Sequence, residues 1–388
     1  MLPFLAAALL AVAAAAPAPG ATLPATGDVV AAPCPFPGVA VARLGAWAWR
    51  DPGWEVIPFQ VDPRTPAGDW AFGRAPLART AVHDEVVVAT ADLGRPAPPG
   101  RRPPGALEVA PLGGAGGVAY LCLHAGDAPR SHRRWLAYDR EREEVVHDGF
   151  TLGFERRRPF VLDRLVWHTD PEGRDWLDTG KFRATGRLFG TFRFHRTRED
   201  FSSRTTGVIE GPVRVVVRTE NRLRMAFGLK SPRSIVDRIH TPRALRLALA
   251  VHIPFRVGWF FSGLTVRSTL DLAPGARRTI TCPNHATTPI DGRPEPSEVA
   301  LLGCPLEGFT IDGPHGSLHG TLSLGPKLHL KAAIYFKDDL HEPDPPERVP
   351  GHLGESGVLL TGWERLGRGD YHLTMLLEMA PRGRATAP

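Results

Sequence analysis

The sequence predicts an all-β protein in which an N-terminal β-barrel or small sandwich is followed by a larger antiparallel β-sandwich region, with few short helices. Apolar and polar residues alternate in short segments along the chain, as they do in half-buried strands. Turns rich in glycine (41 residues) and proline (39 residues) separate these segments. The long amphipathic helices that a Rossmann or TIM-barrel fold requires are missing from the pattern.

The predicted strands follow one another in chain order. Ile57, Phe59 and Val61 alternate with polar or turn-forming neighbours, which is the period-two pattern of a strand with one buried face. Similar alternation, or a continuous apolar run, predicts strands at 85–89, 162–167, 192–195, 213–217, 264–272 and 331–336. Short strands at this spacing are typical of sandwiches and barrels.

The best helical signal lies at 231–239. Ser231 suits the N-cap position, Pro232 suits the first helical position, and Pro242 stops the segment. We therefore expect one short helix here.

The apolar segment 244–264 needs to be tested for membrane insertion. It contains Arg246 and Arg256, and a charged group at mid-bilayer costs roughly 3 kcal/mol even on lenient scales. The pattern instead predicts two strands around Pro254. We expect no transmembrane span once the N-terminal leader is removed.

The chain begins with an apolar run over residues 2–16, followed by a breaker-rich stretch. Such a run fits a signal-peptide core and is shorter than the roughly 20 residues that span a bilayer. We expect residues 1–21 to be a signal peptide, with a buried N-terminal helix as the alternative, and the protein to be secreted or periplasmic. The rest divides into an N-terminal β domain over 22–130 and a β-sandwich region over 131–388.

The four cysteines, Cys34, Cys122, Cys282 and Cys304, all follow the predicted signal peptide. An even number of cysteines in an oxidising compartment predicts disulfides. Three pairings are possible, and we favour Cys282–Cys304 with Cys34–Cys122. Because no C-x-x-C motif is present, a zinc ribbon, a thioredoxin-type site and a c-type haem are unsupported.

The formal charge of +6 says little about partners. Only five of the 47 basic residues are lysine, and the arginines are scattered along the chain. A nucleic-acid footprint concentrates on one element among stacking aromatics, so we expect no nucleic-acid partner. The remaining interpretations are a solvated surface and attraction for an acidic polymer such as a uronate polysaccharide.

Several short motifs resemble those of a known group of proteins. They lie at 56–62 (VIPFQVD), 83–88 (HDEVVV), 92–94, 148–150, 211–215, 335–339 and 369–371. They resemble a poorly characterised secreted bacterial all-β family with a PFQVD…DE N-terminal barrel, distantly similar to exo-acting pectin (rhamnogalacturonan) lyase-like proteins. The resemblance implies the fold and makes carbohydrate-active proteins a candidate class. Relatives often carry an acidic D-x-D-G turn where this chain has Arg64, Pro66 and Trp70, so no metal site carries over there.

The first candidate binding site lies at predicted strand ends. Gln60, Asp62, Asp84 and Glu85 offer oxygen atoms suited to a hard cation or to sugar hydroxyls. Alternatively, the aspartates cap turns and Gln60 satisfies backbone groups.

A second candidate is an acidic loop near the C-terminus. Asp338, Asp339, Glu342 and Asp344 lie close together, and calcium prefers such oxygen ligands. The alternative is a solvated acidic loop, because prolines stiffen the segment and no EF-hand spacing exists. No other cofactor is expected.

Aromatic residues beside polar ones form a third candidate. Trp167, Asp170 and Trp176, with His168, would make a saccharide subsite if the indole faces were exposed. The alternative is that both tryptophans belong to the sandwich core.

The catalytic candidates are His168, Arg193, His195 and Arg214. A polysaccharide lyase needs a cation to neutralise a uronate and a base to remove its α-proton. The chain has no G-x-S-x-G, Walker A or H-E-x-x-H motif, which disfavours the common hydrolases, NTPases and metalloproteases.

The sequence therefore favours a secreted or periplasmic β protein with a non-catalytic binding or structural role, associated with an extracellular polysaccharide or another cell-envelope component. The alternative is a carbohydrate-active enzyme, with a polysaccharide lyase as the leading class. Whether His168, Arg193, His195 and Arg214 line one cleft is the observation that separates the two.

Overall fold

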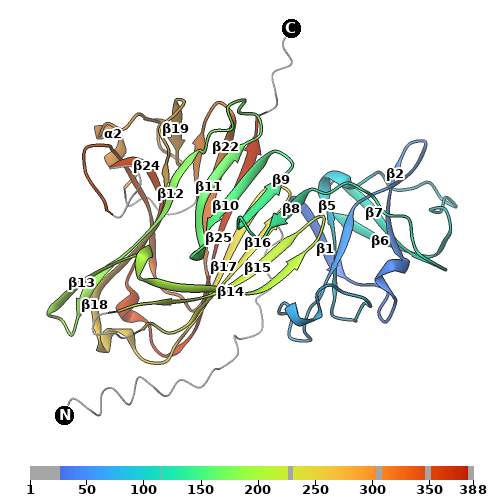
Figure 1. Ribbon diagram of the computed structural model, residues 1–388, viewed down its shortest axis with the longest axis horizontal. Coiled ribbons are helices and arrows are strands. Elements are labelled where there is room, and N and C mark those ends of the chain that lie inside the picture. The colour runs from blue at the N-terminus through green and yellow to red at the C-terminus, as the bar shows by residue number, and fades with distance from the viewer. Residues whose placement is uncertain (1–26, 115, 226–229, 303–307, 346–350, 383–388) are drawn as a thin grey trace, which may run out of the picture.

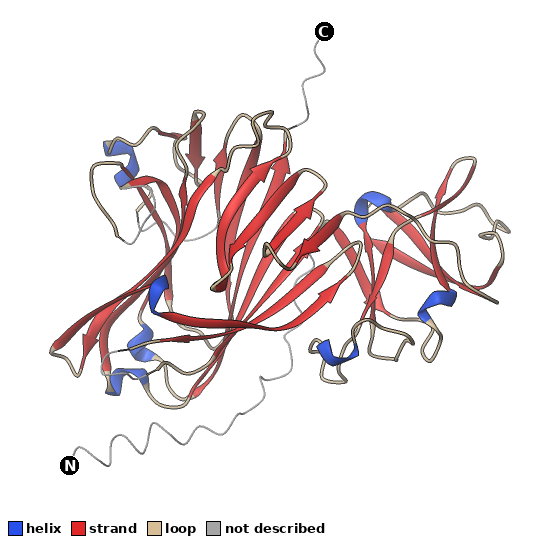
Figure 2. Cartoon of the chain, in the orientation of Figure 1, coloured by secondary structure: helices blue, strands red, loops and turns tan. Residues whose placement is uncertain are grey.

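The computed structural model describes residues 27–114, 116–225, 230–302, 308–345 and 351–382. The predicted signal peptide and Cys304 lie outside these residues. Five antiparallel sheets make up most of the described chain, and helices are few and short, which confirms the predicted all-β class (Figures 1 and 2). No helix in the described ranges is long and apolar enough to cross a membrane.

The N-terminal strands form two sheets that pack face to face as a small sandwich. The first sheet has the order β1 (Val29–Pro33), β5 (Glu85–Ala89), β4 (Phe59–Asp62). The second has the order β3 (Gly53–Val56), β2 (Leu44–Arg50), β7 (Gly117–His124), β6 (Ala106–Gly114). The 3₁₀ turns of this small sandwich are η1 (Val41–Arg43), η2 (Phe72–Arg74) and η3 (Thr90–Asp92). The two sheets share one apolar core. Phe59 and Val86 of the first sheet are buried in the same cluster as Leu44 and Leu121 of the second.

The larger region is built on a nine-stranded sheet. Its order is β14 (Phe201–Glu210), β15 (Val215–Leu223), β16 (Ser234–Thr241), β17 (Ala244–Ile253), β25 (Gly369–Pro381), β22 (Gly316–Leu324), β21 (Phe309–Asp312), β19 (Arg278–Thr281), β20 (Thr288–Ile290). A five-stranded sheet packs beside it in the order β13 (Phe192–Thr197), β12 (Leu177–Leu188), β18 (Phe261–Leu272), β24 (His352–Thr361), β23 (Lys331–Asp339). A four-stranded sheet has the order β11 (Arg158–Trp167), β10 (Phe150–Glu155), β9 (Glu144–His147), β8 (Leu136–Asp139). The short helical elements are η4 (Arg198–Asp200), η6 (Val257–Trp259), α2 (Pro296–Val299) and η7 (Trp363–Arg365).

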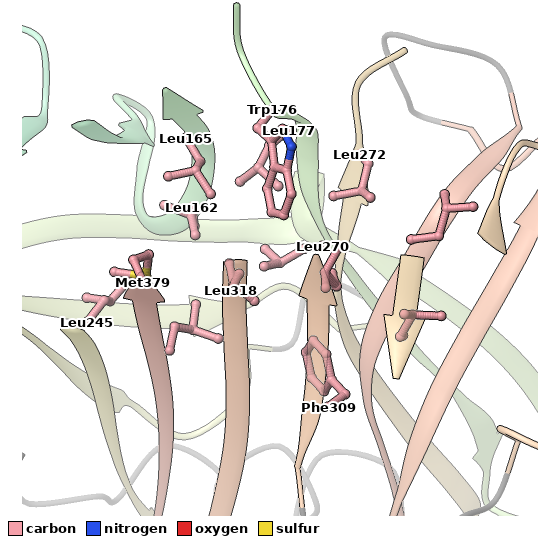
Figure 3. Packing of buried hydrophobic residues seen from close by; sticks show 14 of the residues in the cluster. Leu162, Leu165, Trp176, Leu177, Leu245, Leu270, Leu272, Phe309, Leu318 and Met379 are labelled. Carbon is pink, nitrogen blue, oxygen red and sulfur yellow. The ribbon is translucent and has the colours of Figure 1, made fainter. Parts of the chain in front are cut away.

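The main core lies between these three sheets (Figure 3). Leu245 and Leu318 project from the nine-stranded sheet, Leu270 from β18 and Leu165 from β11, and all are buried. Burying side chains of this size stabilises the fold by roughly 1.5–3 kcal/mol each, before the entropy of ordering them is subtracted. The sheet faces turned away from this core are therefore the surfaces on which polar side chains gather.

The two regions meet across a further apolar cluster. Val87 of β5, Trp135, Val145 of β9 and Val215 of β15 are buried in it together. Strands β1–β7 pair only with one another in the described residues, and so do β8–β25. The division of the chain into separate domains near residue 130 stays a prediction.

The helix predicted over 231–239 is wrong, because this segment holds strand β16. Residues 234–241 pair with β15 on one side and with β17 on the other. The proline and serine that suggested a helix start precede the strand, and Ser231 Oγ instead accepts the N–H of Leu223 at 2.9 Å. Two flanking strands supply a hydrogen-bond ladder that outweighs a weak local helical preference. The two strands predicted around Pro254 are present as β17 and β18.

The predicted Cys34–Cys122 disulfide is not formed, and both residues are buried free thiols. Cys34 belongs to the small sandwich core together with Leu121 and Leu123. Cys122 lies between these leucines on β7, so its side chain points to the opposite face of the sheet. Burial raises the pKa of both thiols, that of Cys122 to about 12. The Cys282–Cys304 pairing stays a prediction, because Cys304 lies outside the described residues.

We expect Cys34 and Cys122 to resist alkylation in the folded protein and to react fully in guanidinium chloride. A buried thiol with a raised pKa presents little thiolate to an alkylating reagent. Peptide mass spectrometry after iodoacetamide treatment, with and without denaturant, measures the modification at each cysteine. A Cys34–Cys122 crosslinked peptide in the non-reduced digest would contradict the structure.

Candidate functional site: the outer face of the five-stranded sheet

Strand register places a row of polar residues on the outer face of the five-stranded sheet. In β12 the side chains of Lys181, Arg183 and Arg187 share one face, because they are separated by even numbers of residues. The intervening residues face the core side, where Leu270 of β18 is buried. The ionisable side chains on this outer face are Lys181, Arg183, Arg187, Arg193, His195, Arg267, Asp271, Lys331, Tyr335, Lys337 and Glu355.

One half of the outer face is closed and holds a buried ion cluster. Lys181 Nζ lies 2.8 Å from Asp271 Oδ2, 3.3 Å from Glu355 Oε2 and 3.7 Å from Asp344 Oδ2, and its side chain is fully buried. It also donates to the Gly351 carbonyl at 3.2 Å. Each buried charge in this cluster is therefore compensated by a partner, as burial requires.

Asp344 reaches this cluster from the loop that follows β23. Its carboxylate accepts hydrogen bonds from Arg183 Nε at 3.2 Å and from an Arg267 terminal nitrogen at 2.8 Å. Arg267 also donates to the Tyr335 hydroxyl at 2.5 Å. Two guanidinium groups and one ammonium group thus converge on a single carboxylate, which shows that this surface binds a carboxylate with Arg and Lys donors.

The pKa values of the two buried carboxyl groups in the cluster are shifted in opposite directions. Burial raises the pKa of Asp271 to about 6, and the attraction of Lys181 offsets only part of that effect. Burial would also raise the pKa of Glu355, but His352, Arg267 and Lys181 outweigh it and hold that pKa at about 2. His352 Nδ1 lies 2.5 Å from Glu355 Oε2. Glu355 therefore remains a carboxylate over the whole physiological range.

The cluster does not suit a metal ion, although Asp344, His352 and Glu355 bring ligand atoms within 4.8 Å of one another. The Lys181 ammonium lies beside two of these groups, and Arg267 pairs with the same two carboxylates. A divalent cation placed there would be repelled by both side chains. Lys181 and Arg267 already provide the positive charge that a metal ion would bring to Asp344 and Glu355.

The four acidic residues proposed as calcium ligands are not gathered together. Asp338 and Asp339 are adjacent on β23 and therefore point to opposite faces. Asp338 accepts the backbone N–H groups of Asp291, Gly292 and Gly354, while Asp339 accepts the N–H of His341. Glu342 pairs with Lys337 at 2.5 Å, and Asp344 belongs to the buried cluster. The solvated-loop alternative does not describe all four residues either, because Asp338 is fully buried and Asp344 is held by Arg183 and Arg267.

The other half of the outer face is an open hollow of about 670 Å³. It is lined by Thr185, Gly186, Arg187, Arg193, Phe194, His195, Ser262 and Gly263. Arg187 and Arg193 are directly opposed across β12 and β13, and His195 is opposed to Thr185. Like charges directly opposed across strands are unfavourable. Among the described residues no carboxylate lines the hollow or pairs with Arg187 or Arg193, so the hollow presents uncompensated positive charge to solvent.

The candidate residues of the N-terminal region form an internal clamp with Arg214. Gln60 Oε1 accepts the backbone N–H groups of Val213 and Arg214 at 2.9 and 2.7 Å. Arg214 Nε donates to Asp62 Oδ2 at 2.7 Å, and the same guanidinium pairs with Glu85. A Cβ at Gly211 would lie 2.2 Å from Gln60 Oε1, so glycine is required where the Gln60 side chain meets the next region. The clamp joins β4 and β5 to the turn before β15.

Asp84 also has a structural set of partners. Two Arg74 nitrogens donate to its carboxylate at 2.7 and 2.9 Å, and the backbone N–H groups of Arg64 and Ala81 donate to it as well. The side chain is fully buried. Asp84 thus caps the turn and its carboxylate oxygens are already occupied by donors of the protein.

The aromatic candidates belong to the core. Trp167 is 1% exposed and contacts Trp176 with ring centroids 5.6 Å apart, so neither indole presents a face on which a sugar could stack. Asp170 is buried beside Arg174 and His315. His168 is exposed, and its ring contacts Thr151 Oγ1 at 2.9 Å.

The four catalytic candidates lie in three separate places. Arg193 and His195 share the open hollow, Arg214 is in the clamp, and His168 follows β11 of another sheet. The sequence interpretation missed Arg187, Lys181, Asp271 and Glu355. The alternation of Lys181, Arg183, Thr185 and Arg187 along one strand was a readable signal for a polar sheet face.

Comparison with known proteins adds little to this geometry. No family model and no curated protein matches the chain. A solved structure of a protein in the glycosyl hydrolase family 38 from Enterococcus faecalis is similar at 10% sequence identity, with a TM-score of 0.43. The alignment covers 92% of this chain and 39% of that chain, so this chain spans well under half the length of that protein.

Proposed function

We propose that this protein is a secreted protein that binds an acidic polysaccharide without cleaving it, using the open hollow on the outer face. The opposed pair Arg187 and Arg193, with His195 beside them and no carboxylate partner among the described residues, carries the proposal. Two guanidinium groups at one site suit the carboxylates of a uronate polymer. The neighbouring Asp344, half-buried and held by Arg183 and Arg267, illustrates the same recognition within the chain.

The absence of cleavage in this proposal follows from where the acid and base side chains lie and from what they already bind. In the described residues of the outer face, Asp271, Glu355 and His352 are buried and engaged in the ion cluster. A general base must lie within hydrogen-bond reach of the proton it removes. Only His195 stands free in the hollow as a base, and no other described acid or base lines it.

We expect Arg187→Ser with Arg193→Ser to weaken binding of polygalacturonate at least tenfold while leaving the melting temperature unchanged. Removing two exposed arginines deletes charge-assisted hydrogen bonds and also relieves their mutual repulsion. Affinity gel electrophoresis or calorimetry of the chain from Thr22 onward measures the dissociation constant. The wild-type affinity should fall as salt is raised, because the attraction is electrostatic.

The control is Arg204→Ser. Arg204 is an exposed arginine of β14 in the nine-stranded sheet, away from the hollow, and it pairs with Glu220 of the neighbouring strand β15. Equal loss of affinity in this control would mean that net charge alone attracts the polymer, and the site assignment would fail. Release of unsaturated uronate products by the wild type, abolished in His195→Gln, would replace the binding function by a lyase.

A further inference from the structure

Exposed aromatic side chains gather at one end of the five-stranded sheet. Phe189 (53% exposed) and Phe192 (57%) lie at the turn of the β12–β13 hairpin, and Trp259 (69%) ends η6 just before β18. The other strongly exposed large apolar residues of the described chain are aliphatic and lie elsewhere. We call Phe189, Phe192, Phe255, Trp259 and Phe260 the aromatic tip.

The two turns of the aromatic tip are held against each other. The Phe189 N–H donates to the Phe260 carbonyl at 2.7 Å. The rings of Phe189 and Phe260 contact edge to face at 6.0 Å, and those of Phe255 and Phe260 at 5.0 Å. None of these three rings belongs to an apolar core cluster of the described residues. Figure 1 shows this hairpin projecting at the end of the molecule opposite the N-terminal strands.

Phe189 occupies a position that disfavours a bulky side chain. Its φ angle is 51°, in the left-handed region, and the following Gly190 is also at positive φ. Asn or Gly would fit this turn with less strain. The backbone of Phe189 is thus strained while its ring is half exposed, and strained backbone positions cluster at functional sites.

The two chain segments that form the aromatic tip carry only positive charge, and one acidic residue, Glu364 of η7, packs beside Gly258. Residues 185–196 contain Arg187, Arg193 and Arg196 and no acidic residue, and residues 254–262 contain Arg256 and no acidic residue. Exposed aromatic residues ringed by arginine suit the interface of an anionic bilayer, where rings lie at the headgroup level and cations attract the lipid phosphates.

We infer that the aromatic tip docks this protein peripherally on an anionic lipid surface. Trp259 and Phe189 enter the headgroup layer, and Arg187, Arg193 and Arg256 contact lipid phosphates. The outer-face hollow then lies next to the bilayer surface. The lipid contact thus shares Arg187 and Arg193 with the polysaccharide site, and it adds the exposed rings of Phe189 and Trp259, which do not line the hollow.

Co-sedimentation with vesicles tests the inference, using the chain from Thr22 onward, which contains every described residue. We expect pelleting with phosphatidylglycerol/phosphatidylcholine vesicles, and at least a tenfold weaker partition for Trp259→Ser combined with Phe189→Asn. Asparagine is favoured at positive φ, so the variant should keep the turn. Trp259→Phe keeps a ring and should still pellet. Leu107→Ser, which removes a 54% exposed side chain of β6, is the matched control.

Several results would overturn the inference. They are failure of the wild type to pellet, equal pelleting of the double variant, and equal pelleting with pure phosphatidylcholine. Loss of polygalacturonate binding in the double variant would make the tip a polysaccharide surface instead. Retained polygalacturonate binding with lost pelleting supports the lipid contact independently of the proposed function.

Discussion

Replacing Lys181 by methionine is expected to lower the free energy of unfolding by about 3–5 kcal/mol. The substitution removes the one ammonium group that lies within 3.3 Å of both Asp271 and Glu355, and both carboxylates are buried. Removing one partner of a buried ion cluster leaves uncompensated charge in a medium of low polarity. Guanidinium unfolding at pH 8, followed by circular dichroism, measures the change.

The same variant should recover part of its stability in acid. The pKa of Asp271 is already raised to about 6 by burial in the presence of Lys181, and losing the ammonium raises it further. Protonation then removes the uncompensated charge, so the deficit should be smaller at pH 5 than at pH 8. Lys331→Met is the control, because Lys331 is exposed on the same face in the edge strand β23. An equal deficit at both pH values would contradict the assigned cause.

Acid is expected to destabilise the wild-type protein through a second buried group, the pair His147 and His240. Their side chains are 2% and 0% exposed, and the centroids of the two imidazole rings lie 5.6 Å apart. The His147 ring stacks on Phe150, and the His240 ring contacts Phe154 edge to face. Within the described residues no ring nitrogen of the pair makes a hydrogen bond of good geometry, although the backbone of Thr241 and Pro242 lies close enough to His147 to offset part of the burial effect on its pKa. Both imidazoles are therefore held neutral.

The direction of the pH effect follows from the two pKa values. Burial lowers the pKa of His147 from 6.5 to about 3, and burial, His147 and Arg238 lower the pKa of His240 well below 6.5. Below pH 6.5 the unfolded chain binds protons that the folded chain does not. Stability is thus lost as the pH falls from about 6.5 toward 3, by roughly 2 kcal/mol for His147 at pH 5, and His240 adds a loss in the same direction.

Unfolding free energies of the wild type and of His147→Leu combined with His240→Leu, measured between pH 5 and pH 8, test this account. The double variant should lose the slope below pH 6.5, because leucine takes up no proton. It should remain stable at neutral pH, since it removes unpaired buried nitrogens from an apolar environment. His329→Gln, an exposed histidine, should keep the wild-type slope. An unchanged slope in the double variant would assign the acid sensitivity to other groups.

Local periodicity accounts for the part of the fold that was predicted correctly. The segment 85–89 is β5, and 264–272 lies within β18, because apolar residues at these positions have no other way to be buried in short segments bounded by turns. The error at 231–239 arose where serine and proline implied a cap although both sides of the segment pair with other strands. Flanking strands are invisible to a local pattern.

The candidate sites show the same division. Arg193 and His195 were recognised from their alternation on one strand, and the structure places both in the hollow. Arg187 was missed because its importance depends on facing Arg193 across the β12–β13 pairing. Arg214, chosen as a catalytic candidate, is instead neutralised by Asp62 and Glu85 from the N-terminal region.

The sequence by itself therefore determined the all-β class, the turn spacing and the polar face of individual strands, since these depend only on residues two to ten positions apart. Tertiary structure alone decided which charges meet. Lys181 and Glu355 are 174 residues apart, and the strand order β12-β18-β24 brings them within 3.3 Å. The physical reason is that a strand encodes which face is buried but not which strand it pairs with, while the partner and the register set every long-range contact.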